Sequence, residues 1–167
     1  MSLKQNLNLG NYLFKNYIFL NDKEKEISLK FRNKNRFWML NTDKIDLKDH
    51  ILWIESLKKR DDILYYLVYK DDIPFMSIDF HDIDLKNKSC YWGYFLGNEN
   101  HKNEVLKVEK LIIDIAFNIL KINNLYCIND INNHVIKIHK FFGFEEVEEI
   151  TIKDRKFLKM LLKKEFV

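Results

Sequence analysis

The residues best suited to bind a charged ligand lie where an apolar run gives way to a helical pattern. Ser89–Gly97 is a nearly continuous apolar stretch, which is typical of a strand in the middle of a sheet. After the polar residues 98–103, apolar side chains recur at spacings of three and four from Val105 to Ile122, which predicts a long helix starting near Glu104. A helix start offers unpaired backbone N–H groups and the positive end of the helix dipole, so this junction is a candidate phosphate site. A plain strand-to-helix junction without a ligand is the alternative.

A second set of polar residues lies along a predicted strand, residues 75–83. Its side chains alternate, with Ile78 and Phe80 on one face and Asp79 and His81 on the other. This alternation predicts that the first face packs in the core while the second stays polar. A carboxylate or an imidazole on that polar face can accept a proton, directly or through a water molecule.

The elements that position these residues follow one another in an α/β order. The sequence first predicts a strand at 11–20, a helix at 24–36 and a second helix from Asp46 to the charged residues 60–62. Three strands follow at 63–69, 75–83 and 89–97, and then the long helix. The last predicted elements are a strand at 125–129, a helix capped by Asn132 and ended by Gly143, and strands at 144–152 and 155–162. With one proline and four glycines there is no sign of a linker, so residues 11–167 are expected to form one domain. Residues 1–10 are polar and aperiodic, and we expect a flexible extension there.

Composition excludes several classes of protein. The 28 basic and 25 acidic residues are interspersed and give a net charge of +3, without the dense basic block of a nucleic-acid-binding protein. No apolar run reaches the roughly twenty residues that span a bilayer, and the N-terminus has no secretion pattern, so we expect a cytoplasmic protein without membrane contact. Cys90 and Cys127 lie in apolar runs rather than at metal-ligand spacing, so buried thiols and no metal site are expected.

The strand, loop and long helix resemble the GNAT superfamily of acyl-CoA transferases, whose pyrophosphate loop usually reads Gln/Arg-x-x-Gly-x-Gly/Ala between such elements. The matching stretch here is His101-Lys102-Asn103-Glu104-Val105-Leu106. Glu104 and Val105 stand where the family has small residues that let phosphates approach the backbone. The resemblance implies acetyl-CoA as co-substrate, held by Phe95, Leu96, Gly97, His101, Lys102, Asn103, Glu104 and Val105, with a main-chain N–H near Leu96 facing the thioester oxygen.

A second resemblance covers the late GNAT signature Asn-x-x-Ala-x-x-Leu-Tyr-x-x-x-Gly-Phe. Asn132, Val135, Ile138, His139 and Gly143-Phe144 follow it with the spacing preserved. The signature tyrosine protonates the departing thiolate, and the resemblance gives this role to His139, with Asn132 and His139 near the cofactor. Imidazolium, of reference pKa about 6.5, is a competent acid for a thiolate of pKa about 8.5. A solvent-facing helical histidine is the alternative for His139.

Scattered residues from about Leu20 to Phe144 are similar to the N-acetyltransferases of pseudaminic acid biosynthesis, which acetylate the amine of a UDP-linked amino sugar. The similarity includes Phe31-Arg32-Asn33, Trp38-Met39 and Leu47-Lys48-x-His50-x-x-Trp53-Ile54. It implies that Arg32 pairs with a diphosphate, Trp53 and Met39 pack on the base or sugar, and His50 donates a hydrogen bond. Each of these residues also has a purely structural alternative, as a surface ion pair, core filler or satisfied polar group.

Together these observations predict an α/β (α+β) fold, namely a single GNAT domain with a mixed sheet of about seven strands and about four helices. The predicted function is acetyl transfer from acetyl-CoA to a nucleotide-linked amino sugar by direct attack of the amine, with His139 as acid and Asp79 or His81 as candidates for the base. The alternatives are acetylation of a protein N-terminus or a small amine, and a catalytically inactive GNAT domain that binds a partner. A monomer or homodimer is expected.

Overall fold

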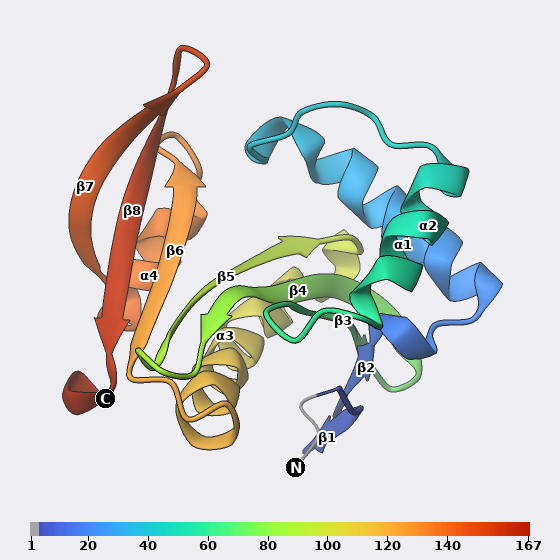
Figure 1. Cartoon of the computed structure of the whole chain (residues 1–167), viewed down its shortest axis with the longest axis horizontal. Helices are drawn as coiled ribbons and strands as arrows, with labels where there is room; N and C mark the ends of the chain where they lie inside the picture. The colour runs from blue at the N-terminus through green and yellow to red at the C-terminus, as the bar shows by residue number, and fades with distance from the viewer. Residues whose placement is uncertain (1–3) are drawn as a thin grey trace.

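The computed structural model describes residues 4–167 and shows one mixed sheet between two helical layers (Figure 1). The strands run in the order β1-β2-β3-β4-β5-β6-β8-β7 and are antiparallel neighbours except for the parallel pair β5 and β6. The strands are β1 (Leu7–Leu9), β2 (Tyr12–Asn16), β3 (Leu64–Lys70), β4 (Ile73–Asp84), β5 (Ser89–Leu96), β6 (Asn124–Asp130), β7 (Glu145–Ile152) and β8 (Arg155–Lys163). The helices are α1 (Asp22–Asn35), α2 (Leu47–Leu57), α3 (Val105–Asp114) and α4 (Val135–Phe141), with short helical turns η1 (Tyr17–Phe19), η2 (Arg36–Trp38), η3 (Glu99–Glu104), η4 (Ile115–Ile119) and η5 (Lys164–Phe166).

The two faces of the sheet bury different sets of side chains, as the alternation along the strands requires. On the face that we call the α3–α4 face, Ile78 and Phe80 of β4 pack with Trp92 of β5 and with Val108 and Ile112 of α3 in the larger core. On the opposite face, the α1–α2 face, a smaller apolar cluster joins α1 and α2 to the sheet and consists of Tyr17, Leu20, Phe31, Ile54, Leu57, Ile63 and Leu67. A residue of β5 therefore faces one helical layer, and its neighbour in sequence faces the other.

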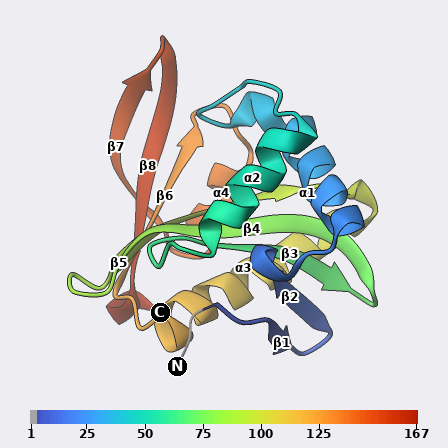
Figure 2. The same cartoon turned by 45° about the vertical axis from the view of Figure 1, so that its right-hand side comes forward.

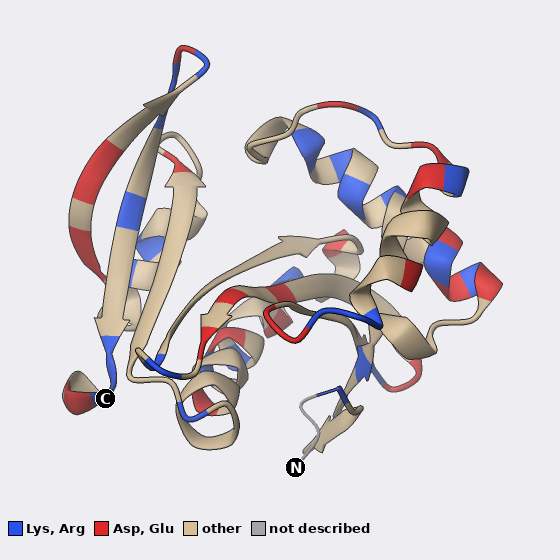
Figure 3. Ribbon diagram, in the orientation of Figure 1, with Lys and Arg blue, Asp and Glu red and all other residues tan. Residues whose placement is uncertain are grey.

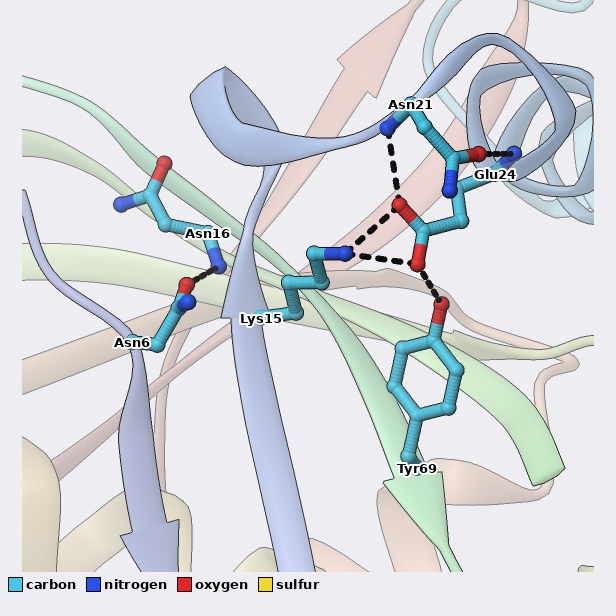
Figure 4. Close-up of polar contacts among 6 residues, drawn as sticks. All are labelled: Asn6, Lys15, Asn16, Asn21, Glu24 and Tyr69. Carbon is cyan, nitrogen blue, oxygen red and sulfur yellow. Dashed lines mark hydrogen bonds and ion pairs between the residues drawn. The ribbon is translucent and has the colours of Figure 1, made fainter. Parts of the chain in front are cut away.

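Local sequence explains how several elements begin and turn. Asn21 caps α1 by accepting the Glu24 N–H at 2.9 Å, and the Glu24 carboxylate accepts the Asn21 N–H in return at 2.8 Å (Figure 4). The same carboxylate accepts hydrogen bonds from Lys15 of β2 at 2.7 and 2.8 Å and from the Tyr69 hydroxyl of β3 at 2.7 Å. The start of α1 is thus fixed to two strands.

The β3–β4 and β7–β8 hairpins turn at two residues each, as the polar turns in the sequence predict. Asp71 and Asp72 have φ of 50° and 63°, and Lys153 and Asp154 have φ of 46° and 63°. Positive φ at both central residues defines the type I′ turn, whose twist matches that of paired strands.

The parallel pair β5 and β6 is short, and this is the feature of the fold that shapes the site. Its register covers Ser89↔Asn124, Cys90↔Leu125 and Tyr91↔Tyr126, while β5 continues to Leu96 beside β4 alone. Beyond Tyr91 the two strands separate, so that β6, β8 and β7 stand away from the end of β5 (Figures 1 and 2).

Most predicted elements are confirmed, and four details of the prediction are wrong. The long helix predicted through Ile122 is α-helical only to Asp114; it continues as the π-helical turn η4 and has ended by Lys121, whose φ is 60°. Leu7–Leu9 form β1 paired with β2, so the predicted N-terminal extension contributes an eighth strand; residues 1–3 of that extension lie outside the described residues. The first predicted strand ends at Asn16, whose side chain accepts the Ile18 N–H and starts a 3₁₀ turn. Asn132 does not cap α4, because the N-cap is His134 and the side chain of Asn133 accepts the Val135 N–H at 3.1 Å.

Charge of both signs is spread over the molecule, with a row of glutamates on the edge strand β7 (Figure 3). Within residues 4–167 no helix is long and apolar enough to cross a membrane. In the same residues no group of three or more His, Cys, Asp or Glu side chains is arranged to hold a metal ion.

Candidate active site

The junction between β5 and α3 begins with a break in strand pairing. The N–H groups of Gly97 and Asn98 both donate to the Phe75 carbonyl, at 2.8 and 2.9 Å. The register of β4 with β5 is regular from His81↔Tyr91 to Met76↔Leu96, so the break in pairing comes directly after Leu96, near which sequence analysis expected a main-chain N–H that faces the thioester. The Leu96 carbonyl accepts a hydrogen bond from Asn35 at 2.8 Å, which attaches the end of α1 to the end of β5.

The predicted phosphate loop is helical before α3 starts. Asn98 caps the 3₁₀ turn η3, and the Val105 N–H donates to the Lys102 carbonyl where η3 passes into α3. Lys102 and Asn103 are exposed at this corner. His101 instead stacks on Phe75, with ring centroids 5.2 Å apart, and its Nδ1 is buried without a partner. The exposed cation and amide are therefore the side chains that an arriving anion meets first.

Glu104 turns its side chain away from the loop and into the protein. Its carboxylate accepts hydrogen bonds from the Tyr12 hydroxyl and from Lys70 Nζ at 2.6 Å, and Lys107 Nζ lies 3.5 Å away. The hydrogen bonds from Lys70 and Tyr12 lower the pKa of Glu104 to about 2. Because Tyr12 and Lys70 face each other across β2 and β3, this carboxylate fastens the start of α3 to the sheet.

The His139 side chain is buried on the α3–α4 face of the sheet, which excludes the alternative of a histidine that faces solvent. It is 2% exposed, and its Nδ1 lies 2.7 Å from Oε1 of Glu109, which is fully buried on α3. The Trp92 and Tyr94 rings of β5 contact the imidazole edge-on, at centroid distances of 5.1 and 6.0 Å. The predicted acid thus sits against the part of β5 that has separated from β6.

Glu109 and Tyr94 both contact His139, and sequence analysis did not single them out. Oε2 of Glu109 and the Tyr94 hydroxyl are both buried without a hydrogen-bond partner. Burial, together with the charge of Glu109, raises the pKa of Tyr94. A signal was present in the sequence, since Glu109 falls four residues after Val105 and three before Ile112, inside the apolar stripe of the helix. A carboxylate in such a position requires a buried partner, and here the partner is His139.

Asp79 and His81 form a pair on the α1–α2 face. Their Oδ2 and Nδ1 atoms lie 2.6 Å apart, with Asp79 9% exposed and the His81 side chain 39% exposed. Burial lowers the pKa of His81, but the Asp79 carboxylate outweighs it, and the net shift is upward. Asp79 faces Gly93 of β5 across the sheet, and Oδ1 lies 3.3 Å from where a Cβ on Gly93 would be. Glycine therefore leaves room for this carboxylate beside β5.

The predicted acceptor residues lie on the same face but make protein contacts of their own. Arg32 donates to the carbonyls of Asp43 and, at 2.9 Å, of Asn41, in the segment that joins α1 to α2. His50 is 3% exposed, and its Nε2 lies 2.8 Å from the Ser28 hydroxyl. Burial and the charge of Arg32 lower the pKa of His50 to about 4, so the ring is neutral at pH 7.

Trp53 and Met39 complete this group. Trp53 stacks on His50 at 5.6 Å and meets Tyr65 edge-on at 4.7 Å, and Tyr65 in turn faces Asp79 across β3 and β4. Met39 follows η2, and its carbonyl accepts a hydrogen bond from Arg155 at 2.7 Å. The structure thus brings Arg32, His50 and Trp53 to the face that holds Asp79 and His81, whereas Met39 lies in the segment after α1 that is bound to Arg155 of β8. His139 lies on the other face. Asn132 is exposed at the end of β6.

The separation of β5 and β6 connects the two faces. Beyond Tyr91, β5 presents Gly93 beside Asp79 on one face and Trp92 and Tyr94 beside His139 on the other. The candidate bases Asp79 and His81 and the candidate acid His139 thus lie on opposite sides of this opening.

Comparison with known proteins identifies the family. The chain is 34% identical over 115 residues to the acetyltransferase PseH of Campylobacter jejuni subsp. jejuni serotype O:23/36 (strain 81-176), covering 66% of this chain and 69% of the relative. PseH of serotype O:2 (strain ATCC 700819 / NCTC 11168) is 31% identical over 122 residues, covering 72% and 75%. The chain belongs to the PseH acetyltransferase family. No profile of a known protein family matches it.

Solved structures agree with this PseH assignment. The crystal structure of Campylobacter jejuni N-acetyltransferase PseH in complex with acetyl coenzyme A superposes with a TM-score of 0.75 at 29% identity, covering 92% of this chain and 99% of that one. The spermidine N-acetyltransferase of Vibrio cholerae in complex with CoA and spermine gives a TM-score of 0.82 at 11% identity, covering 94% and 98%, and shows the shared fold alone. The fold and the family predicted from sequence, a GNAT acetyltransferase of the pseudaminic acid type, are confirmed.

Proposed function

We propose that the chain transfers the acetyl group of acetyl-CoA to the amine of a nucleotide-linked amino sugar of the pseudaminic acid type. Membership of the PseH family supports this reaction, and a PseH structure contains acetyl coenzyme A. The observation that carries the proposal is the separation of β5 from β6 beyond Tyr91, which places Asp79 with His81 and Glu109 with His139 on opposite sides of one opening in the strand pairing.

The residues of the β5–α3 junction fit a CoA diphosphate. Lys102 and Asn103 are exposed at the start of the helix, where the dipole and a side-chain cation favour an anion. The Glu104 carboxylate is bound to Tyr12 and Lys70, so its charge points away from the phosphates. Acetyl-CoA supplies an activated thioester, and we place it along the unpaired edge of β5, with Phe95–Gly97 beside it, Asn132 of the β6–α4 loop near it and His139 of α4 near it.

Glu109 and His139 form the acid side of the proposed reaction. As the amine nitrogen bonds to the acetyl carbon, it releases its second proton to water and the carbon–sulfur bond breaks. The departing thiolate takes a proton from the imidazolium of His139. Because Nδ1 of His139 is bound to Glu109, Nε2 is the nitrogen that gives the proton. The carboxylate stabilises the charged ring in a site from which water is excluded.

His81 and Asp79 form the base side. An attacking amine must first lose its ammonium proton, and the neutral imidazole of His81 takes it, directly or through a water molecule. Nδ1 of His81 is bound to Asp79, so Nε2 is the accepting nitrogen. The raised pKa of His81 makes it a stronger base than an isolated imidazole.

The acceptor lies on the α1–α2 face in this proposal. In the unliganded protein the Arg32 guanidinium donates to the backbone carbonyls of Asn41 and Asp43. When the nucleotide sugar binds, a phosphate oxygen replaces one of these carbonyls as acceptor. Trp53 and Met39 pack on the apolar parts of the nucleotide sugar. The His50 ring stacks on the ring of Trp53, and its Nε2 keeps the hydrogen bond with the Ser28 hydroxyl. Both substrates are cytoplasmic metabolites, so we place the enzyme in the cytoplasm. The oligomeric state, monomer or homodimer, stays a prediction.

A direct acceptor screen tests the function. The purified chain is incubated with acetyl-CoA and either a UDP-linked amino sugar, spermidine or a peptide with a free N-terminus, and free thiol and acetylated product are measured. The proposal predicts product with the UDP-amino sugar alone, and loss of that product in His139→Ala. Product with spermidine or the peptide instead would establish one of the alternative acceptors, and no product with any amine would support an inactive binding domain.

A further inference from the structure

Two arginines hold the segment that joins α1 to α2, which we call the α1–α2 segment (residues 36–46). They bind its backbone at alternate carbonyls along the chain. Arg155 of β8 donates to Phe37 at 2.8 Å and to Met39 at 2.7 Å, and Arg32 of α1 donates to Asn41 at 2.9 Å and to Asp43. A guanidinium suits this task because its donors form a planar fork that engages two acceptors at once.

Arg32 and Arg155 differ in where they come from. Arg32 belongs to the helix that leads into the segment, so its bonds are local. Arg155 begins β8, far along the chain and on the other side of the opening between β5 and β6. In Figures 1 and 2 the part of the α1–α2 segment next to α1 reaches toward the strands β6 and β8. Arg155 therefore connects the α1–α2 segment to strands β6 and β8, which lie on opposite sides of the proposed reaction centre.

Asp130, the last residue of β6, fixes Arg155 in place. Its Oδ2 lies 2.8 Å from Nη2 of Arg155, and its Oδ1 accepts the Asn132 N–H at 3.0 Å. The side chains of Arg155 and Asp130 are 28% and 12% exposed, so the contact is partly shielded from solvent. One guanidinium thus connects the proposed acceptor segment to the loop that carries Asn132, a candidate cofactor residue.

The segment has little apolar packing to hold it without these bonds. Its large side chains Phe37, Trp38 and Leu40 are 63%, 47% and 49% exposed. Its position consequently depends on hydrogen bonds to its backbone, and those from Arg155 are the ones that tie it to the C-terminal strands.

We infer that Arg155 is a positioning residue for the acceptor: it sets the distance between the α1–α2 segment and the β6–α4 loop, and so holds Met39 and its neighbours where the nucleotide sugar binds. The inference rests on the proposed function for its kinetic consequence. Its structural consequence, an ordered α1–α2 segment, stands independently of any substrate.

Backbone amide exchange of the unliganded protein tests the structural part. Arg155→Ala should speed hydrogen–deuterium exchange of peptides from residues 37–45 by about tenfold or more, while peptides from α3 keep their rates. Arg60→Ala is the matched control, because Arg60 makes an exposed ion pair with Asp62 and should leave the segment unchanged. Unchanged exchange at 37–45 in Arg155→Ala would overturn the inference.

Kinetics test the positioning part. Arg155→Ala should raise the KM for the UDP-amino sugar by about tenfold and change the KM for acetyl-CoA by less than about twofold. If Arg155 had a purely structural role, Arg155→Ala would change both KM values equally. Asp130→Asn would then change them as much as Arg155→Ala does. The inference instead predicts a smaller effect in Asp130→Asn, which keeps the guanidinium and its two carbonyl bonds. If no variant and no wild type acetylates an amino sugar, the proposed function fails while the exchange result still decides the role of Arg155.

Discussion

Replacing Glu104 in the proposed phosphate loop distinguishes a carboxylate that stabilises the fold from one that opposes acetyl-CoA binding. In the structure its carboxylate is buried against Tyr12 and Lys70. Breaking such a pair leaves Lys70, whose side chain is 23% exposed, without its anion. With allowance for that exposure, we expect Glu104→Ala to lower the free energy of unfolding by about 2 to 3 kcal/mol.

A second variant at this position, Glu104→Gly, tests whether the carboxylate opposes acetyl-CoA binding. A carboxylate within about 6 Å of a phosphate charge, at an effective dielectric constant of about 20, would oppose binding by roughly 3 kcal/mol, so its removal would tighten binding by roughly a hundredfold. Because the Glu104 side chain points to Tyr12 and Lys70, we expect Glu104→Gly to change the dissociation constant by less than about threefold.

Urea denaturation and isothermal titration measure these two quantities, with Lys107→Ala as the control. Lys107 is 67% exposed and only 3.5 Å from the carboxylate, so its loss should cost less than about 1 kcal/mol. The lowered pKa of Glu104 also implies stability that is complete above pH 4.5 and is lost as the pH falls toward 2. A stable Glu104→Gly protein that binds acetyl-CoA far more tightly would refute the reasoning.

Three further predictions follow from buried groups. Burial favours the neutral ring of His50 and lowers its pKa to about 4. As the pH falls from about 7 to 4, the wild type should therefore lose about 3 kcal/mol more unfolding free energy than His50→Gln. Equal losses in the two proteins, measured by urea denaturation at each pH, would contradict this. A Cβ on Gly97 would lie 2.0 Å from the Phe31 ring, so Gly97→Ala should cost about 2 kcal/mol or more in thermal unfolding, and Phe31→Leu should recover part of it. His139→Ala should lower kcat by about a hundredfold and Glu109→Gln by about tenfold, with the KM for acetyl-CoA nearly constant; equal losses in kcat and affinity would point to a packing role.

The sequence predicted the elements whose signals are local. The three-and-four spacing after Val105 gave α3, Asp46 capped α2 as expected, and Gly143 ended α4 with φ of 91°. Strand β1 was missed because three residues without alternation give no period, and its existence depends on pairing with β2. Asn132 failed as a cap because Asn133, one residue later, accepts the N–H of Val135.

The candidate site was predictable only in part, because its decisive contacts join residues far apart in sequence. His139 was found through a signature, but its partner Glu109 lies 30 residues away on another helix. Whether a carboxylate at position 104 faces a bound phosphate depends on the direction of its side chain. That direction is set by Lys70 and by Tyr12, which lies 92 residues away. Arg155 gave no signal at all, since its acceptors are backbone carbonyls and carry no side-chain pattern.

The central claim is that acetyl-CoA binds where β5 parts from β6, with its diphosphate at the start of α3. A crystal structure of the protein with bound acetyl-CoA tests it most directly. The account predicts phosphate density beside Lys102 and Asn103 and the thioester sulfur within hydrogen-bond reach of His139. Acetyl-CoA density elsewhere on the molecule, or a thioester facing away from His139, would contradict it.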